Sequence, residues 1–327
     1  MTTLVPPQPA SSVAHGAVPT ARPTWLGLLR GELFKLSRQR FNWFMALGVT
    51  VVTIGPYLYA VIGQNNSRTL DAMRNPPQLF LWYLMGFALA LQRVVVGIFL
   101  LTMTARMVGL DYQQGTLRVL LARGADRLQL LGAKLVSVTL VGLGLLAWGI
   151  VLNVLGALMF VRAVAGNFDP IKALTPAYWV GVRIDILTVL VSMGVSILLA
   201  AAVTIVTRSL SFGLATALGW FAADNLAVPI ILRTAYILTN GNDFWQKVSA
   251  YFLGPELNVM PSVVVPALQI TGTLQGHVTS KLVAAPVLGV TPLVNYDGTH
   301  ALMVALVYGV IFAASAALVM WRRDVLE

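Results

Sequence analysis

The sequence predicts an all-α integral membrane protein with six transmembrane helices and both termini in the cytoplasm. Hydrophobic residues make up 57% of its 327 residues and charged residues only 10%, and the mean hydropathy is +0.79. In an ordinary soluble domain about 25% of the residues are charged. Six windows are also long enough to cross the hydrocarbon core, which takes about 20 apolar residues in a helix. Because backbone groups in lipid have to be hydrogen-bonded within the protein, these windows are predicted to be helices.

The six predicted spans share an apolar run that is bounded by polar or basic residues. They cover residues 41–62, 79–107, 135–160, 184–206, 210–232 and 301–321. Cytoplasmic loops of membrane proteins carry an excess of Lys and Arg. With the N-terminus inside, the cytoplasmic segments hold 13 of the 22 lysines and arginines and the outer segments 8, although the outer segments are longer. We therefore expect a multi-pass protein of the cell membrane, in contact with membrane lipid, and we read the net charge of +10 as a topology signal rather than a nucleic-acid surface.

Residues 1–23 are predicted to form a disordered cytoplasmic tail, and residues 24–327 the membrane domain. The tail mixes Pro, Ala, Ser and Thr and lacks the basic start and apolar centre of a signal peptide. Thr24 is placed to cap a short helix. Four apolar residues then recur at helical spacing: Trp25, Leu29, Leu33 and Leu36. This amphipathic helix is expected to lie in the headgroup region with its aromatic and leucine side in the membrane, as an anchor, a docking element or both.

The cytoplasmic segment between the second and third spans predicts two short helices around a turn. Gly115 and Thr116 mark a helix start, and three leucines then share one face of that helix, namely Leu117, Leu120 and Leu121. After a turn at residues 123–125, Asp126 is placed to cap the next helix, with Gln129 completing a capping-box-like pair. That second helix runs into the third span. Two short helices held rigidly at the membrane surface could receive the movement of a cytoplasmic subunit. The alternative is an ordinary basic loop exposed to solvent.

This segment resembles the cytoplasmic loop of ABC-2 type transporter permeases. Those usually read Glu-x-x-x-Gly-Thr-Leu-Arg, then two leucines, then Ser-Arg, and Gly-Lys at the next span. The matching string here is Asp111…Gly115-Thr116-Leu117-Arg118-Val119-Leu120-Leu121…Arg127…Gly132-Ala133-Lys134. Two further stretches fit, Glu32-Leu-Phe-Lys35-Leu36 before the first span and Trp321-Arg322-Arg323-Asp324 after the last. The chain departs from this pattern at two places. Asp111 stands where glutamate is usual and is also a carboxylate, and Gly124-Ala125-Asp126 stands where Pro-x-Ser is common and also ends in a residue that can cap a helix.

The resemblance implies the membrane-spanning permease subunit of an ATP-driven ABC transporter, with export favoured over import. It implies a separate ATP-binding subunit, a second permease copy or homologous permease, and short outer helices between the last two spans. The ATPase-docking residues that it implies are Glu32 and Lys35 in the first element and Asp111, Gly115, Thr116, Arg118 and Arg127 in the second, to which we add the predicted cap, Asp126. A six-span assembly or regulatory protein without transport activity is the alternative from another class.

Nothing in the sequence predicts catalysis by this chain. A Gly-x-x-x-x-Gly-Lys-Ser/Thr phosphate loop does not occur, so ATP and Mg²⁺ are expected to bind to the partner subunit rather than here. The chain has no cysteine and three scattered histidines without an acidic cluster, so we expect neither a cofactor nor a metal site. Nucleic-acid binding is not expected either.

Two charges fall deep inside predicted spans, Arg93 in the second and Asp224 in the fifth. A lone charge at such depth costs roughly 2.5–3.5 kcal/mol on insertion scales, so each is expected to face protein or water and to have a partner. Their estimated depths differ little, and the sequence predicts an Arg93–Asp224 pair, with Asn225 or Asn153 nearby, facing the bundle interior or the translocation path. Alternatively, Arg93 snorkels and Asp224 lies near the outer headgroups.

The remaining predictions concern the connections of the last three spans. Thr207-Arg208-Ser209 leaves almost no loop between the fourth and fifth spans, which predicts a tight helical hairpin. In the outer segment, the aromatic residues between 244 and 252 predict an interfacial helix. The apolar stretch at 263–270 is too short to span and is predicted to be re-entrant or surface-lying.

Overall fold

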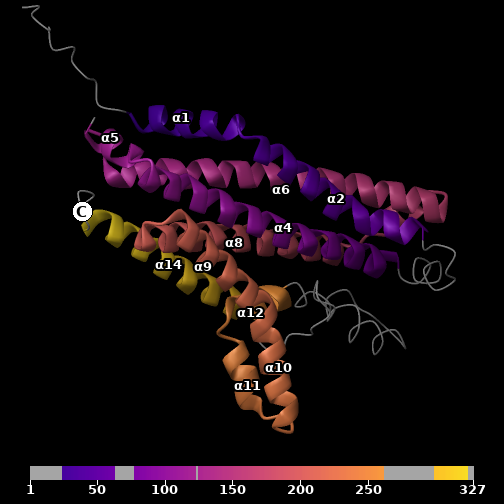
Figure 1. The fold of residues 1–327 in the computed structure, drawn as a ribbon. Coiled ribbons are helices and arrows are strands. Elements are labelled where there is room, and N and C mark those ends of the chain that lie inside the picture. The colour runs from indigo at the N-terminus through magenta and orange to yellow at the C-terminus, as the bar shows by residue number, and fades with distance from the viewer. Residues whose placement is uncertain (1–23, 63–76, 123, 261–297, 323–327) are drawn as a thin grey trace, which may run out of the picture.

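A computed structural model describes residues 24–62, 77–122, 124–260 and 298–322, and every regular element in these ranges is a helix. The helices form an elongated bundle, with one helix along its side and a helical pair projecting from it (Figure 1). The all-α class is thus confirmed for the described part. The predicted tail at 1–23, the apolar stretch at 263–270 and the residues Arg323 and Asp324 lie outside the described residues.

Six helical segments are long and apolar enough to cross a membrane, as the sequence predicts. They are α2 (Arg40–Ile62), α4 (Pro77–Gln113), α6 (Arg127–Ala165), α8 (Pro176–Thr207), the run of α9 (Leu210–Ala222), a π-helical turn (Ala223–Ala227) and α10 (Val228–Leu238), and α14 (Gly298–Arg322). Most extend beyond the predicted apolar windows, because polar residues at the ends continue the helical hydrogen bonding. In α6 this extension includes the second helix that the sequence predicts in the cytoplasmic loop.

Five shorter helices complete the described fold. They are α1 (Trp25–Ser37), α5 (Thr116–Ala122), α7 (Asp169–Lys172), α11 (Asp243–Ser249) and α12 (Leu253–Val259). Helix α1 lies along the bundle beside α6, and α1, α5 and the end of α14 gather at one end of the molecule (Figure 1). The predicted interfacial helix in the outer segment corresponds to α11, whose N-cap Asn242 accepts a hydrogen bond from the Phe244 N–H.

Helices α4 and α8 form the centre of the bundle, where most of their apolar side chains are buried. Helices α2 and α14 lie at the periphery and expose large apolar side chains, such as Phe44 at 67% and Leu306 at 67%. Contiguous apolar surface of this kind is unfavourable in water but suits a helix that faces lipid tails. The pattern of exposure therefore agrees with a membrane-embedded bundle.

The connection between α8 and α9 is the tight hairpin that the sequence predicts. Helix α8 ends at Thr207 and α9 begins at Leu210, and the Ser209 side chain caps α9 by accepting a hydrogen bond from the Phe212 N–H at 3.3 Å. The two helices approach closely at Gly213, where an added Cβ would lie 2.6 Å from the Thr204 Oγ1. Small residues allow such approaches between helices in membranes.

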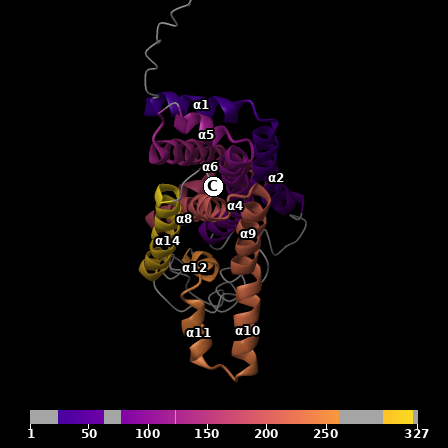
Figure 2. The same cartoon turned by 60° about the vertical axis from the view of Figure 1, so that its left-hand side comes forward.

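The fifth span is interrupted, and this feature has no counterpart in the sequence predictions. After the π-helical turn, α10 and α11 project from the side of the bundle (Figure 1), and in the second view α10 continues the line of α9 (Figure 2). The chain then returns through α12, whose Leu253 and Leu257 pack against Ala301 and Ala305 of α14. π-helical turns within helices occur frequently at functional sites.

Candidate functional site

Helix α1 is anchored to the bundle by its polar as well as its apolar residues. Its predicted cap is present, since the Thr24 side chain accepts a hydrogen bond from the Gly27 N–H at 3.2 Å. The leucine side, expected to lie in the membrane, partly packs on protein instead: Leu36 is 1% exposed. Glu32, one turn before Leu36, is 4% exposed and forms an ion pair with Lys134 of α6. This pair draws the Glu32–Leu36 side of α1 onto the bundle.

Lys134 is the centre of a buried ion network. Its Nζ lies 3.0 Å from Glu32 Oε1 and 2.7 Å from Asp111 Oδ2, and it donates a hydrogen bond to the Met107 carbonyl at 3.3 Å. Glu32, Asp111 and Lys134 are each at most 8% exposed. Buried charges are very costly unless they are paired. The network therefore holds α1, the end of α4 and the start of α6 in one arrangement.

Helix α5 rests on this network. Gly115 has φ +66, a left-handed conformation that glycine adopts without strain, and this reverses the chain between α4 and α5. The Thr116 hydroxyl then donates a hydrogen bond to Asp111 Oδ1 at 2.9 Å. Leu117 is 3% exposed, and Leu120 and Leu121 are half-buried in the same cluster, as predicted for one apolar face. The predicted first loop helix is confirmed.

The predicted docking residues differ in accessibility. Lys35 and Arg118 are exposed, and Lys35 makes an ion pair with Glu32 at 3.1 Å. Asp126 occupies the predicted N-cap position of α6 but makes no side-chain cap hydrogen bond, so the predicted capping box is wrong. Its exposed carboxylate is open to solvent, which competes for the hydrogen bond. Glu32 and Asp111, in contrast, lie beneath the surface, where they hold Lys134 and Thr116 in place.

Lys134 is the central residue that the sequence predictions leave without a role. One feature of the sequence could have indicated this role: Lys134 is a single lysine at the start of an apolar run, and a buried lysine needs an anionic partner. Its two partners, Glu32 and Asp111, both belong to the predicted docking set.

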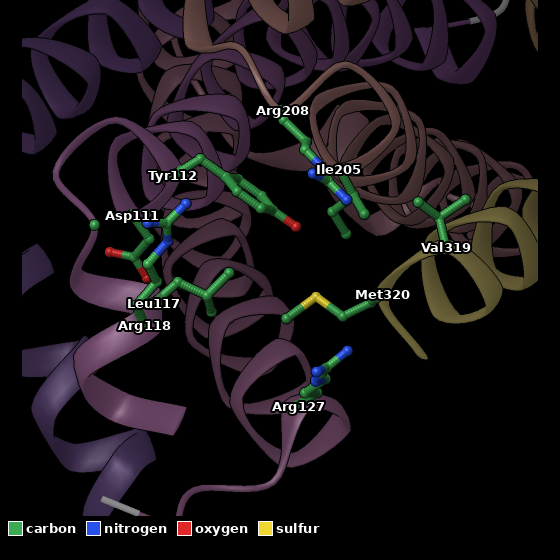
Figure 3. A pocket seen from close by; sticks show the side chains of 10 residues that line it. Asp111, Tyr112, Leu117, Arg118, Arg127, Ile205, Arg208, Val319 and Met320 are labelled. Carbon is green, nitrogen blue, oxygen red and sulfur yellow. The ribbon is translucent and has the colours of Figure 1, made fainter. Parts of the chain in front are cut away.

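A cavity of about 200 Å³ opens beside this network, between the ends of α4, α8 and α14, helix α5 and the start of α6 (Figure 3). In the close-up, Tyr112, Arg127 and Arg208 point towards it. We call this cavity the arginine cavity. It is lined by Asp111, Tyr112, Gly115, Leu117, Arg118, Arg127, Ile205, Arg208, Val319 and Met320. Three arginines, Arg118, Arg127 and Arg208, therefore lie on one cavity together with the carboxylate of Asp111. Within the described ranges, no group of three or more histidine or acidic side chains is placed to hold a metal ion.

Arg93 and Asp224 both lie in the interior, and each is 5% exposed. They are close enough to attract one another but are not joined by a direct ion pair among the contacts of the described residues. Instead, Arg93 Nη2 donates a hydrogen bond to Asn258 of α12, and Asp224 accepts one from the Gly254 N–H at the start of α12. Both charges thus fasten the short helix α12 to the bundle.

The two asparagines expected near this pair have other partners. Asn153 accepts a hydrogen bond from the Tyr57 hydroxyl at 2.8 Å, which joins α2 to α6. Asn225 donates to the Phe221 carbonyl of its own helix at 3.0 Å. No pattern in the sequence favours Asn258 as a partner of Arg93, because its segment lies beyond the fifth span and only the fold brings it back to the bundle.

No curated protein matches the chain. A family model described as ABC-2 family transporter protein matches residues 28–223, which is more than half of the chain. The matched region runs from α1 to the start of the π-helical turn and contains the whole Glu32–Lys134–Asp111 network. With its six membrane-spanning helices, the chain therefore belongs to the ABC-2 family of transporter proteins and is a multi-pass membrane permease.

Proposed function

We propose that this permease is the membrane subunit of an ABC exporter in the cell membrane, and that a separate ATP-binding subunit docks on α1, α5 and the turn before α6. On this proposal α1, α5 and both termini are cytoplasmic, and ATP and Mg²⁺ bind to the partner. The observation that carries it is the buried Glu32–Lys134–Asp111 network beneath these surface elements.

The proposed docking surface consists of exposed groups on a rigid support. Arg118 is exposed on α5, and its neighbour Val119 is 54% exposed although apolar. A force on α5 reaches α4 through the Thr116–Asp111 hydrogen bond, and reaches α6 and α1 through Lys134. Closure of an ATP-binding subunit would in this way move the ends of two spans together.

A second permease copy, or a homologous permease, is proposed to cover the face formed by α9 and α10. Phe212, Ile231 and Ile237 are each 62% exposed there. The α10–α11 hairpin also projects from the bundle and offers apolar surface beyond it (Figure 1). The substrate path would then run between the two membrane halves.

The test is retention of an ATP-binding subunit on affinity-purified protein in mild detergent, followed by the ATPase activity of the complex. Arg118→Glu with Val119→Asp is expected to reduce retention about tenfold or more, because surface contacts of this kind contribute around 1 kcal/mol each. Arg183→Glu, an exposed charge reversal near the other end of the bundle, serves as the matched control. Equal retention by the docking variant and the control would contradict the docking surface. A parent protein that retains no ATPase would favour the assembly or regulatory protein.

A further inference from the structure

We infer that α12 is a releasable latch held by the two interior charges, and that Arg93 and Asp224 pair directly with one another when α12 leaves. Because only contacts within this chain are involved, the latch does not depend on ATPase docking. Helix α12 lies between α14 and the fifth span, and packs against α14 through Leu253 and Leu257 (Figure 2).

Helix α12 depends on its neighbours for its structure. It has seven residues, and an isolated helix of fewer than about 12 residues is marginal in water. Its N-cap residue, Phe252, provides no side-chain cap for the first N–H groups. The contacts of α12 with the bundle therefore decide whether it stays in place.

The two interior charges hold α12 at both of its ends. Asp224 accepts a hydrogen bond from the Gly254 N–H at the start, and so supplies from another segment the cap that α12 lacks. Arg93 donates a hydrogen bond to Asn258 near the end. The start of α12 also lies directly against the fifth span, since a Cβ added to Gly254 would collide with the backbone carbonyl of Asp224.

The same two charges can also satisfy one another. Arg93 Nη1 and Asp224 Oδ1 are buried and have no hydrogen-bond partner among the described residues. The two side chains are near enough to attract one another. Because a buried charge is costly unless it is paired, departure of α12 would favour a direct ion pair between them. The seated helix and the direct ion pair are thus alternative states of one switch.

Release of α12 would open a polar place in the interior. Leu253 and Leu257 of α12 line a cavity of about 20 Å³ together with Ser192, Ser196 and Asp224. In the seated state this cavity has room for about one water molecule. Since α12 forms one of its walls, the departure of α12 would enlarge the cavity and expose the polar side chains of α8 and the fifth span. The latch would in this way control access to the bundle interior.

The experiment uses the absence of cysteine from the chain. In the full-length permease, purified into phosphatidylcholine nanodiscs, a single cysteine replaces Ala301, which is 1% exposed and packs against α12. Its rate of reaction with N-ethylmaleimide measures how often α12 leaves. A cysteine at Asn167, an exposed position, gives the rate of an open site. Adding Asn258→Leu to Ala301→Cys is expected to raise the rate about tenfold or more, because a hydrogen bond to a charged group is lost from the seated state.

Asp224→Asn distinguishes a latch from a simple structural tie. The asparagine amide oxygen can still accept the hydrogen bond from the Gly254 N–H, but the ion pair of the released state is lost. Added to Asn258→Leu, this substitution should therefore lower the rate about fivefold, because an interaction between charged groups contributes more than a neutral hydrogen bond. If Asp224 only tied α12 down, the same substitution would raise the rate further.

Gly254→Ala provides a second release variant that leaves Arg93, Asp224 and Asn258 unchanged. The added methyl group should push α12 away from the fifth span and raise the rate about tenfold. Adding Asp224→Asn should again lower it. Gly219→Ala is the matched control, since its Cβ meets nothing within 4 Å, and it should react like the parent.

Two results would overturn the inference. An unchanged rate in both Asn258→Leu and Gly254→Ala would mean that these contacts do not control the departure of α12. A further rise when Asp224→Asn is added to either release variant would mean that no ion pair with Arg93 stabilises the released state.

Discussion

Replacing Lys134 with methionine is expected to destabilise the permease more than any substitution of an exposed charge. The change removes the cation that lies within 3.0 Å of two buried carboxylates. Breaking a buried ion pair by removing one partner costs about 3–5 kcal/mol, because the other charge is left uncompensated. Here Glu32 keeps an ion pair with Lys35 at 3.1 Å, and Asp111 keeps the Thr116 hydroxyl at 2.9 Å. The cost should therefore lie near the lower end, at about 3 kcal/mol.

Thermal unfolding in a neutral-lipid nanodisc measures this cost as a change in Tm. For large chains 1 kcal/mol corresponds to roughly 2 °C, so Lys134→Met is expected to lower Tm by about 6 °C. Lys35→Met is the matched control, since its side chain is 57% exposed and belongs to the same network. A surface ion pair contributes about 0–1 kcal/mol, so this control should lower Tm by about 2 °C at most.

A compensating variant separates lost charge balance from lost packing. Lys134→Met combined with Glu32→Gln and Asp111→Asn leaves no buried charge in the network, and it should recover at least half of the lost Tm. If Lys134→Met lowers Tm no more than Lys35→Met does, the network does not hold α1, α4 and α6 together and the reasoning is refuted.

Three further predictions follow from the topology, the packing and the outer helices. A cysteine at Asn167 should react with a membrane-impermeant reagent in intact cells and one at Gln114 only after permeabilisation; the reverse pattern would invert the proposed orientation. Gly213→Ala should lower Tm through overpacking worth about 1–3 kcal/mol, because its Cβ would lie 2.9 Å from a backbone Cα of α8, whereas Gly219→Ala meets nothing within 4 Å and should be neutral. Burial raises the pKa of Glu256, on α12, to about 7 from its ordinary value of 4.5, so its contribution to stability is fully present below pH 4.5 and is lost as the pH rises through 7. Glu256→Gln should flatten the dependence of Tm on pH over this range, and an unchanged slope would contradict the assignment.

The sequence by itself determined the class of the protein and the positions of its six spans. Apolar length and helical spacing are local properties, so the six spans, the cap at Thr24 and the start of α5 after Gly115 could all be predicted. The loop resemblance pointed to the ABC-2 family, which the family match over residues 28–223 shows. The prediction of a capping box at Asp126 was wrong, because whether a side chain caps depends on its competition with solvent.

The tertiary structure alone decided which charges meet. Glu32 and Lys134 are 102 positions apart, and Arg93 and Asn258 are 165 apart. Each pairing depends on how helices rotate and cross, which the packing of the whole bundle sets. The arginine cavity likewise needs residues from α4, α5, α6, the α8–α9 connection and α14. A linear pattern can place an arginine at the membrane surface, but only the packed helices determine whether three of them surround one space.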